Sequence, residues 1–223
     1  MKNNLKHLKI FAFTHRKLDV VKIGLLHIEP SEQTSRLQGV KAQFGIDELM
    51  FLSTCNRVEF TMVSSISIAP EKLIESLYPE LPAEETAFLA RHVEEYIAEE
   101  AVNHAFSVAS SIESMIVGER EIITQVRNAF ESANKNKLTG DFLRLLIRQV
   151  IQTAKKVYTQ TSIATKPVSV VSLAYHKLKE LNIPLDSRIL IIGSGATNST
   201  MCKFLKKHGF SNFAVFNRTL SNA

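Results

Sequence analysis

The chain has 223 residues and is 45% hydrophobic, so it can bury one large core or two small ones, and a disordered or collagen-like protein is excluded. Its net charge of +5 is modest and by itself indicates only solubility and weak attraction to polyanions. Two cysteines are too few for a disulfide framework or a cysteine-rich zinc cluster, and the sequence shows neither a membrane span nor a signal peptide, so we expect a cytoplasmic protein without a membrane partner.

The first 82 residues predict a small α+β unit. Apolar runs with charged breaks predict strands in three segments: residues 6–28, with two short strands around a turn at 15–19, residues 47–53 and residues 58–63. Pro70 opens a predicted helix, which Pro79 and Pro82 close because proline cannot continue a helix.

Beyond Ala83 the hydrophobic period becomes that of helices and stays so to about Thr161. Residues 139–141 interrupt this stretch, and residues 142–158 predict an amphipathic helix with basic residues on its polar side. Lys166-Pro167 marks the next boundary. We therefore expect an α+β domain over residues 1–163, with a small antiparallel sheet and long helices, and an α/β domain over residues 164–223.

Charge is unevenly distributed along the chain. Basic residues dominate residues 1–22 and 135–166, whereas residues 71–100 carry nine glutamates against two basic residues. Such segregation is typical of a face that binds nucleic acid, because lysine and arginine release phosphate counterions. An ordinary solvated helix face is the alternative, and the sequence leaves both open.

Residues 189–217 predict the β-α-β start of a dinucleotide-binding domain. Strand ILII precedes the string GSGATN, and a helix and the strand FAVFN follow. The two glycines allow a tight turn and bring backbone N–H groups to a pyrophosphate, although Asn198 occupies the third glycine position. After the second strand comes Arg218, where NAD enzymes have an acidic residue, so NADP is favoured over NAD. A turn that merely needs glycine is the alternative.

Cys55 follows a strand and lies among polar residues, a setting that suits a nucleophile. We expect the neighbouring Arg57 to lower the pKa of the thiol. A buried structural cysteine is the ordinary alternative, and we assign Cys202 to it.

His104 lies within a helical, largely apolar run, where a satisfied, half-buried histidine would be ordinary. Ser114, Glu119 and Gln125 follow it, and their spacing alone does not define a site. The other histidines lack metal-ligand spacing, so we expect no metal site.

Four segments together resemble glutamyl-tRNA reductase, the NADPH-dependent enzyme that begins tetrapyrrole (porphyrin and haem) synthesis from glutamate. They are STCNRVE (53–59), AVNHAFSVASSIESMIVGEREIITQV (101–126), VSVVSLA (168–174), and GSGATN (193–198) with NRT (217–219). They occur in the family's order across about residues 50–220.

The resemblance implies an oxidoreductase in which the Cys55 thiolate attacks the ester of glutamyl-tRNA and forms an enzyme thioester. Reduction by NADPH then releases glutamate-1-semialdehyde. His104 falls at the family's catalytic histidine, a general acid or base for the thiol or the leaving ribose oxygen. Arg57 would pair with the glutamate side-chain carboxylate in bidentate fashion.

Further residues take roles from the same resemblance. Eight match substrate contacts: Thr54, Asn56, Arg57, Ser114, Glu119, Arg120, Glu121 and Gln125. Nine match or extend the NADPH site: Gly193, Ser194, Gly195, Ala196, Thr197, Asn198, Asn217, Arg218 and Thr219. The resemblance makes residues 1–163 the catalytic and substrate-binding domain and residues 164–223 the beginning of a Rossmann-type NADP-binding domain. It names glutamyl-tRNA as substrate and the downstream aminomutase as candidate partner.

The chain also departs from the family pattern. The family's NHKTAPVELRE-like stretch is reduced to residues 26–31, and the glycine of its GLDSM string is Ser111. The segment 164–223 is shorter than the roughly 100 residues of an ordinary nucleotide-binding domain, so we expect an incomplete one. The helical domain through which the family dimerises is not included. We therefore expect a fragment of a reductase or a shortened relative.

Two other functions remain open from the sequence. One is a non-reducing relative that binds tRNA or a partner protein. The other is a stand-alone NADP-dependent dehydrogenase of the shikimate type, which shares the glycine loop and NRT but does not explain residues 54–59.

Overall fold

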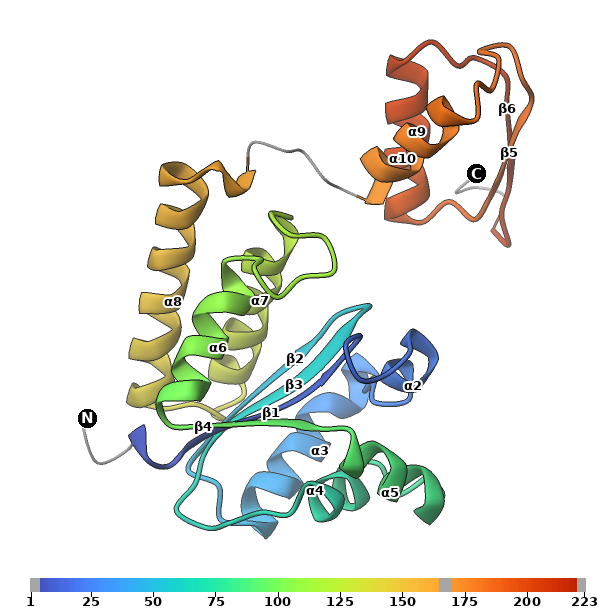
Figure 1. Cartoon of the computed structure of the whole chain (residues 1–223). Coiled ribbons are helices and arrows are strands. Elements are labelled where there is room, and N and C mark those ends of the chain that lie inside the picture. Colours follow the sequence, from blue (N-terminus) through green and yellow to red (C-terminus); the bar gives the residue numbers. More distant parts are fainter. Residues whose placement is uncertain (1–4, 165–169, 220–223) are drawn as a thin grey trace. The chain divides into compact units, whose positions relative to one another are not determined.

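The computed structural model describes residues 5–164 and 170–219. The chain divides into two compact units, Met1–Ala164 and Thr165–Ala223, each of which has its own sheet (Figure 1). No helix within the described ranges is long and apolar enough to span a membrane.

The first unit is built on a four-stranded antiparallel sheet with the order β2-β3-β1-β4. Its strands are β1 (Leu8–Thr14), β2 (Glu48–Ser53), β3 (Arg57–Val63) and β4 (Glu94–Ile97). The predicted strands at 47–53 and 58–63 are confirmed, as is the first of the two strands predicted within 6–28. The small antiparallel sheet of the expected α+β fold is therefore present.

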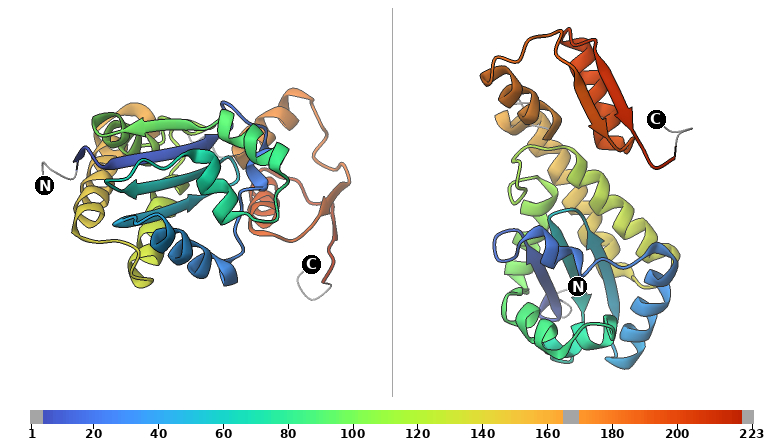
Figure 2. Two further views of the ribbon diagram at one scale, coloured as in Figure 1. Left: turned by 90° about the horizontal axis from the view of Figure 1, so that it is seen from below. Right: turned by 90° about the vertical axis from the view of Figure 1, so that its right-hand side faces the viewer.

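Helices cover both faces of this sheet (Figures 1 and 2). On one face lie α2 (Val20–Gly24), α3 (Pro30–Gln43), α4 (Pro70–Leu77) and α5 (Ala83–Arg91). On the other lie α6 (Glu99–Ala109), α7 (Glu121–Lys135) and α8 (Asp141–Gln160), and the 3-10 turn η1 (Ser162–Ala164) follows. Because both faces are covered, every residue of the central strand β3 is buried, polar ones included.

The break predicted at residues 139–141 is the start of α8, and a side chain from the sheet caps it. The Glu48 carboxylate of β2 accepts the backbone N–H groups of Gly140 (2.8 Å), Phe142 (3.1 Å) and Leu143 (2.8 Å). These are N–H groups that a helix cannot satisfy by itself. The first residue of strand β2 is thereby joined to the N-terminus of helix α8.

Three predictions about this unit are corrected. The second strand expected within residues 6–28 is the short helix α2, since Asp19 caps it by accepting the N–H of Lys22 at 2.8 Å. The helical stretch from Ala83 to Thr161 is interrupted by strand β4, which pairs with β1. The helix expected through residues 101–117 ends at Ala109, where Ser111 takes a positive φ of 60°.

Helix α3 corresponds to no prediction from the sequence. Pro30 opens it, and its residues are mostly polar, with only Leu37 and Val40 buried. A surface helix that buries so little leaves a weak periodic signal.

The second unit contains two parallel strands, β5 (Ile189–Ile192) and β6 (Phe213–Phe216), joined through α10 (Ala196–Lys207). Helix α9 (Val170–Glu180) precedes them and packs on α10, where Tyr175 stacks on His208 with ring centres 4.2 Å apart. The two predicted strands and the predicted helix between them are confirmed. The predicted boundary at Lys166-Pro167 lies outside the described residues.

Candidate active site

Cys55 lies in the turn between β2 and β3, and its thiol is free and exposed. Thr54 shapes this turn. Its backbone N–H donates to the Arg57 carbonyl at 2.9 Å, and its hydroxyl oxygen accepts the N–H groups of Asn56 (3.3 Å) and Arg57 (3.2 Å). The N–H of His15, just after β1, donates to the Asn56 carbonyl at 3.1 Å. The thiol is thus presented to solvent on a turn that is fixed from within and from the neighbouring strand.

Arg57 does not have the open guanidinium expected from the sequence. Its side chain is only 2% exposed, with Nη1 2.7 Å from Glu59 Oε1, and Nη2 donates to the carbonyl of Glu113. Arg57 and Glu59 are two residues apart on β3 and point to the same face, which α6 covers. The structure therefore assigns this guanidinium to an internal ion pair rather than to the Cys55 thiol or a substrate carboxylate.

His104 of α6 completes a buried chain of charged groups. Its Nε2 lies 3.0 Å from Glu59 Oε1, the oxygen that Arg57 also binds, and its ring stacks on Tyr96 with centres 3.9 Å apart. Burial opposes ionisation of Glu59, but His104 and Arg57 outweigh it and hold the pKa of this carboxyl below its ordinary value. Because a carboxylate only accepts hydrogen bonds, the arrangement requires the proton on Nε2 of His104.

Arg16, in the turn after β1, extends this chain toward solvent. Its Nη2 lies 2.9 Å from the Tyr96 hydroxyl and 3.1 Å from Glu94 Oε1, and Nη1 pairs with the Glu113 carboxylate. Partial burial opposes its charge, but Glu94, Tyr96 and Glu113 raise the pKa of Arg16 above its ordinary value. Thr14 also donates to Glu94 at 2.6 Å.

Sequence reasoning did not assign roles to four members of this cluster: Arg16, Glu94, Tyr96 and Glu113. Glu59 lies within the motif string STCNRVE, but the sequence predicted no role for it. The available signal was a charged residue inside an apolar strand, as in VEFTMV, since buried charges need partners.

The loop between α6 and α7 carries three of the predicted substrate contacts: Ser114, Glu119 and Arg120. Ser111 opens it in the left-handed conformation. The Ser111 hydroxyl accepts the Gly118 N–H at 3.0 Å and donates to the Ile116 carbonyl at 3.3 Å. Side-chain hydrogen bonds thus hold a left-handed backbone conformation that a glycine would adopt more freely.

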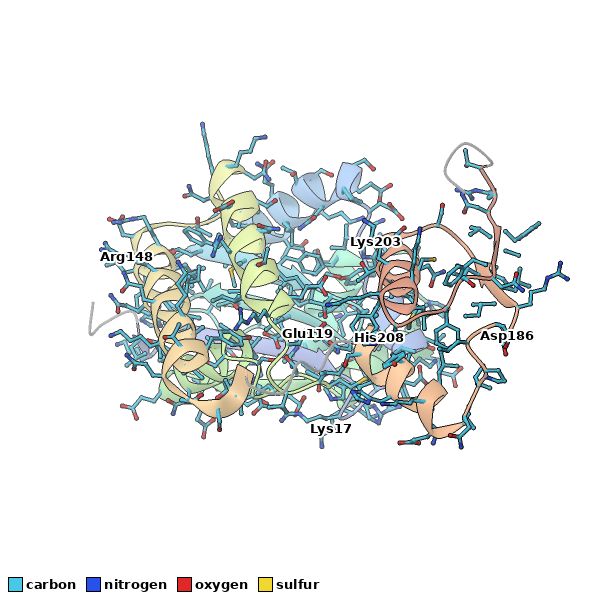
Figure 3. The ribbon with its side chains drawn as sticks, turned by 90° about the horizontal axis from the view of Figure 1, so that it is seen from above. Lys17, Glu119, Arg148, Asp186, Lys203 and His208 are labelled. Atoms are coloured by element: carbon cyan, nitrogen blue, oxygen red, sulfur yellow. The ribbon has the colours of Figure 1, made fainter. Side chains whose placement is uncertain are left out.

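The far end of this loop packs against α8 and η1. The Tyr158 hydroxyl donates to the Glu119 carbonyl at 2.6 Å, and a Cβ atom added to Gly118, whose φ is +90°, would overlap the carbonyl oxygen of Ile163. Partial burial, and then Glu121, raise the pKa of Glu119 (labelled in Figure 3).

The predicted site residues of this unit therefore form two groups, one near the Cys55 turn and one at the far end of the α6–α7 loop and the start of α7. Hydrogen bonds join Thr54, Asn56 and Arg57 in the β2–β3 turn, and His104 is linked to Arg57 through the Glu59 carboxylate. Ser114 directly follows the residue that Arg57 binds. Glu119 lies at the other end of the loop, Glu121 and Gln125 belong to the first turns of α7, and Arg120 and Glu121 are exposed.

In the second unit, the glycine loop is ordered by its own side chains. Gly193 has a φ of +91° and donates its N–H to the Phe216 carbonyl at 2.7 Å. The amide of Asn198, at the position where the dinucleotide-binding pattern has its third glycine, donates to the carbonyls of Ile192 (2.8 Å) and Gly193 (2.9 Å) and so holds the loop.

The start of α10 has the features of an anion site. Gly195 precedes the helix, no side chain caps its N-terminus, and nothing lies within 4 Å of a Cβ atom placed on Gly195. Asn217 accepts the Ser194 N–H at 3.3 Å, and Arg218 is exposed just after β6. Open backbone at a helix N-terminus with an arginine following the second strand fits a pyrophosphate and a 2′-phosphate.

Helix α8 exposes the basic residues singled out in the sequence: Arg144, Arg148, Lys155 and Lys156 (Arg148 is labelled in Figure 3). Arg144 is 2.8 Å from Asp141, an exposed ion pair on the same helix. Lys166, the last residue of the basic stretch, lies outside the described residues.

Comparison with known proteins identifies a family. The family model described as "Glutamyl-tRNAGlu reductase, N-terminal domain" matches residues 11–161, about two thirds of the chain. Curated relatives named glutamyl-tRNA reductase include those of Syntrophobacter fumaroxidans, 31% identical over 219 residues, and Hydrogenovibrio crunogenus, 34% identical over 218 residues.

Each alignment covers 97% of this chain but only 48% and 50% of those two proteins, so the chain spans about half the length of the curated relatives it matches. Among solved structures, glutamyl-tRNA reductase from Methanopyrus kandleri is similar, with a TM-score of 0.65 and 27% identity, and the match covers 98% of this chain and 51% of that one.

Proposed function

Because this chain belongs to the glutamyl-tRNA reductase family, we propose that it contributes the catalytic half of an enzyme that reduces glutamyl-tRNA to glutamate-1-semialdehyde, with Cys55 as the nucleophile. The observation that carries the proposal is the placement of Cys55. Its exposed thiol lies on a turn fixed by Thr54, beside a buried Arg57–Glu59–His104 chain, inside the region that the family model matches.

The first chemical step is acyl transfer. The Cys55 thiolate attacks the carbonyl of the ester that joins glutamate to the tRNA, the C–O bond breaks, and the ribose oxygen leaves and takes up a proton. A thioester with Cys55 remains. A thioester carbonyl receives less resonance donation than an ester carbonyl and is therefore easier to reduce.

His104 is the proposed acid or base for the Cys55 thiol or the leaving ribose oxygen. Glu59 fixes the proton on its Nε2, and stacking on Tyr96 fixes the plane of its ring, so Nδ1 is the nitrogen left for exchange. Arg57 acts in this proposal from inside the protein, by neutralising Glu59 and holding the carbonyl of Glu113.

We propose Thr54, Asn56 and Ser114 as the nearest substrate contacts, since they lie on the Cys55 turn or next to the residue that Arg57 binds. Glu119, Arg120, Glu121 and Gln125 would act at the far end of the α6–α7 loop and the start of α7. The exposed basic side chains of α8 would meet the tRNA backbone, because phosphate contacts position a nucleic acid without reading its sequence.

NADPH is the proposed cofactor, and when bound it supplies the hydride that reduces the thioester. The residues that would hold it are the loop Gly193–Asn198 and the string Asn217-Arg218-Thr219. The open, uncapped start of α10 and the exposed Arg218 support this assignment. They also support the interpretation of β5–α10–β6 as the beginning of a Rossmann-type domain.

The test is to trap the acyl-enzyme. We expect the purified chain, incubated with glutamyl-tRNA labelled on glutamate and without NADPH, to carry one glutamyl group on the Cys55 peptide by mass spectrometry. Cys55→Ser should abolish the thiol-linked label, and Cys202→Ser should retain it.

A label that persists in C55S, or that resides on Cys202, would overturn the assignment of the nucleophile. Adding NADPH separates the two half-reactions. Semialdehyde formation supports the whole proposal, and release of free glutamate without NADPH oxidation supports only acyl transfer by this chain.

A further inference from the structure

We infer that Arg16 is a positioning residue of the candidate active site, which holds both the Tyr96–His104 stack and the α6–α7 loop in place. The inference deepens the proposed function and rests on it, because it concerns how the proposed catalytic groups are held. Nothing in the sequence motifs singled out Arg16.

The first argument is connectivity. Arg16 lies in the turn after β1, and its guanidinium contacts two other segments: Glu94 and Tyr96 on β4, and Glu113 on the α6–α7 loop. Along the sequence, Glu94 lies 78 residues after Arg16 (16 to 94), and Glu113 lies 97 residues after it. A single side chain thus links three segments that are distant along the chain.

The second argument is that these links close a ring of contacts that includes His104. Tyr96, which Arg16 binds through its hydroxyl, stacks on the His104 ring. His104 binds Glu59, Glu59 binds Arg57, and Arg57 binds the carbonyl of Glu113, whose carboxylate returns to Arg16. A shift of the Arg16 guanidinium therefore acts on both the ring plane of His104 and the loop that carries Ser114.

The third argument is exposure. The Arg57 and Glu59 side chains are 2% and 5% exposed, whereas Arg16 is 39% and Glu113 25% exposed. Arg16 is therefore a member of the ring that solvent reaches, so it can be changed without leaving a fully buried charge. A substitution there should loosen the site and leave the fold intact.

The fourth argument is chemical. Nη1 and Nη2 of Arg16 point to different segments at the same time, which requires the planar fork of a guanidinium. A lysine would keep the charge but has a single nitrogen for these partners. The conservative variant should therefore restore function only in part.

The experiment compares Arg16→Gln, Arg16→Lys and a matched control, Arg36→Gln, in the full chain. Arg36 also binds two carboxylates, those of Glu32 and Glu80, and a backbone carbonyl, but it belongs to α3, on the opposite face of the sheet. Two quantities are measured: the single-turnover rate of Cys55 acylation by glutamyl-tRNA with its apparent Kd, and amide hydrogen exchange in residues 110–120.

We expect Arg16→Gln to slow acylation about 10- to 100-fold while Kd changes less than about threefold, because misplacement of catalytic groups by an ångström can cost 100-fold. Exchange in residues 110–120 should quicken in the same variant. Arg16→Lys should fall between the wild type and Arg16→Gln, and Arg36→Gln should match the wild type in both measurements.

Two outcomes overturn the inference: a wild-type acylation rate in Arg16→Gln, or exchange in residues 110–120 that Arg16→Gln and Arg36→Gln alter equally. Failure of the proposed function is distinguishable, since the wild type itself would then not be acylated at Cys55. In that case the exchange measurement alone decides whether Arg16 holds the loop.

Discussion

Glu59 is the centre of the buried chain of charges, and replacing it with glutamine tests the reasoning about that chain most directly. The substitution keeps the shape of the side chain and removes one charge. Arg57, whose side chain is 2% exposed, would lose its buried carboxylate partner and keep the carbonyl of Glu113. Removing one partner of a buried ion pair costs on the order of 3–5 kcal/mol, because the remaining charge stays desolvated.

This loss of stability is large enough to measure by hydrogen exchange in the sheet of the first unit. At about 1.4 kcal/mol per factor of ten, hydrogen exchange of the β1 and β3 amides at pH 7 should quicken roughly 10²- to 10⁴-fold in Glu59→Gln. Measuring those amides reports on the sheet itself and not on the second unit. The control is Glu32→Gln, which removes a carboxylate from an exposed ion pair with Arg36 and should leave the exchange close to that of the wild type.

The pH dependence gives an independent check. Burial opposes ionisation of Glu59, but His104 and Arg57 lower its pKa below the ordinary 4.5, so its stabilising contribution is fully present above that value. The contribution is lost as the pH falls through the lower pKa of the folded state. The difference in stability of the sheet between the wild type and Glu59→Gln should therefore be largest near neutral pH and should decrease below about pH 4.5. A difference in stability under about 1 kcal/mol at pH 7, or one that does not decrease in acid, would refute the reasoning.

Three further predictions follow from the same structure. Iodoacetamide at pH 7 should modify the exposed Cys55 well before the partly buried Cys202, as peptide mapping would show; the reverse order contradicts the assignment of the nucleophile. Gly118→Ala should lower stability by more than about 1 kcal/mol, because Gly118 has a positive φ and an added Cβ atom would overlap the backbone of Ile163. Gly39→Ala, in the open middle of α3, should instead raise stability by about 0.4–1 kcal/mol, and equal shifts in melting temperature would contradict both expectations. Glutamine in place of four basic residues of α8 should weaken tRNA binding: Arg144, Arg148, Lys155 and Lys156. The salt dependence of binding should flatten by up to about one log-log unit per lost contact, and an unchanged slope would mean that this is an ordinary solvated face.

At the candidate site, some features follow from local signals in the sequence and others do not. The strands β2 and β3 and the exposed Cys55 turn between them were predictable, because apolar runs and a polar break are local signals. The order of β5, the glycine loop, α10 and β6 was predictable for the same reason. The role of Cys55 as a nucleophile and the binding of NADPH remain predictions.

One error came from an element that depends on a partner elsewhere in the chain. Strand β4 has only four residues and pairs with β1, more than 80 residues before it, so no local pattern marks it within a helical region. Helix α2 was mistaken for a strand for a local reason: its residues VVKIG are mostly apolar and β-branched, which favours a strand, whereas the cap by Asp19 begins a helix.

For the site itself, the sequence by itself determined which groups are available: a cysteine after a strand, an arginine and a glutamate two residues apart, and a histidine in a helix. Only the tertiary structure decided how they are used, since the packing of α6 on the sheet buries Arg57 against Glu59 and places His104 on the same carboxylate. It also brought Arg16 to Glu113, 97 residues away, to close the ring. The physical reason is that a buried charge must find a partner, and which partner it finds depends on how distant segments pack, which no local pattern encodes.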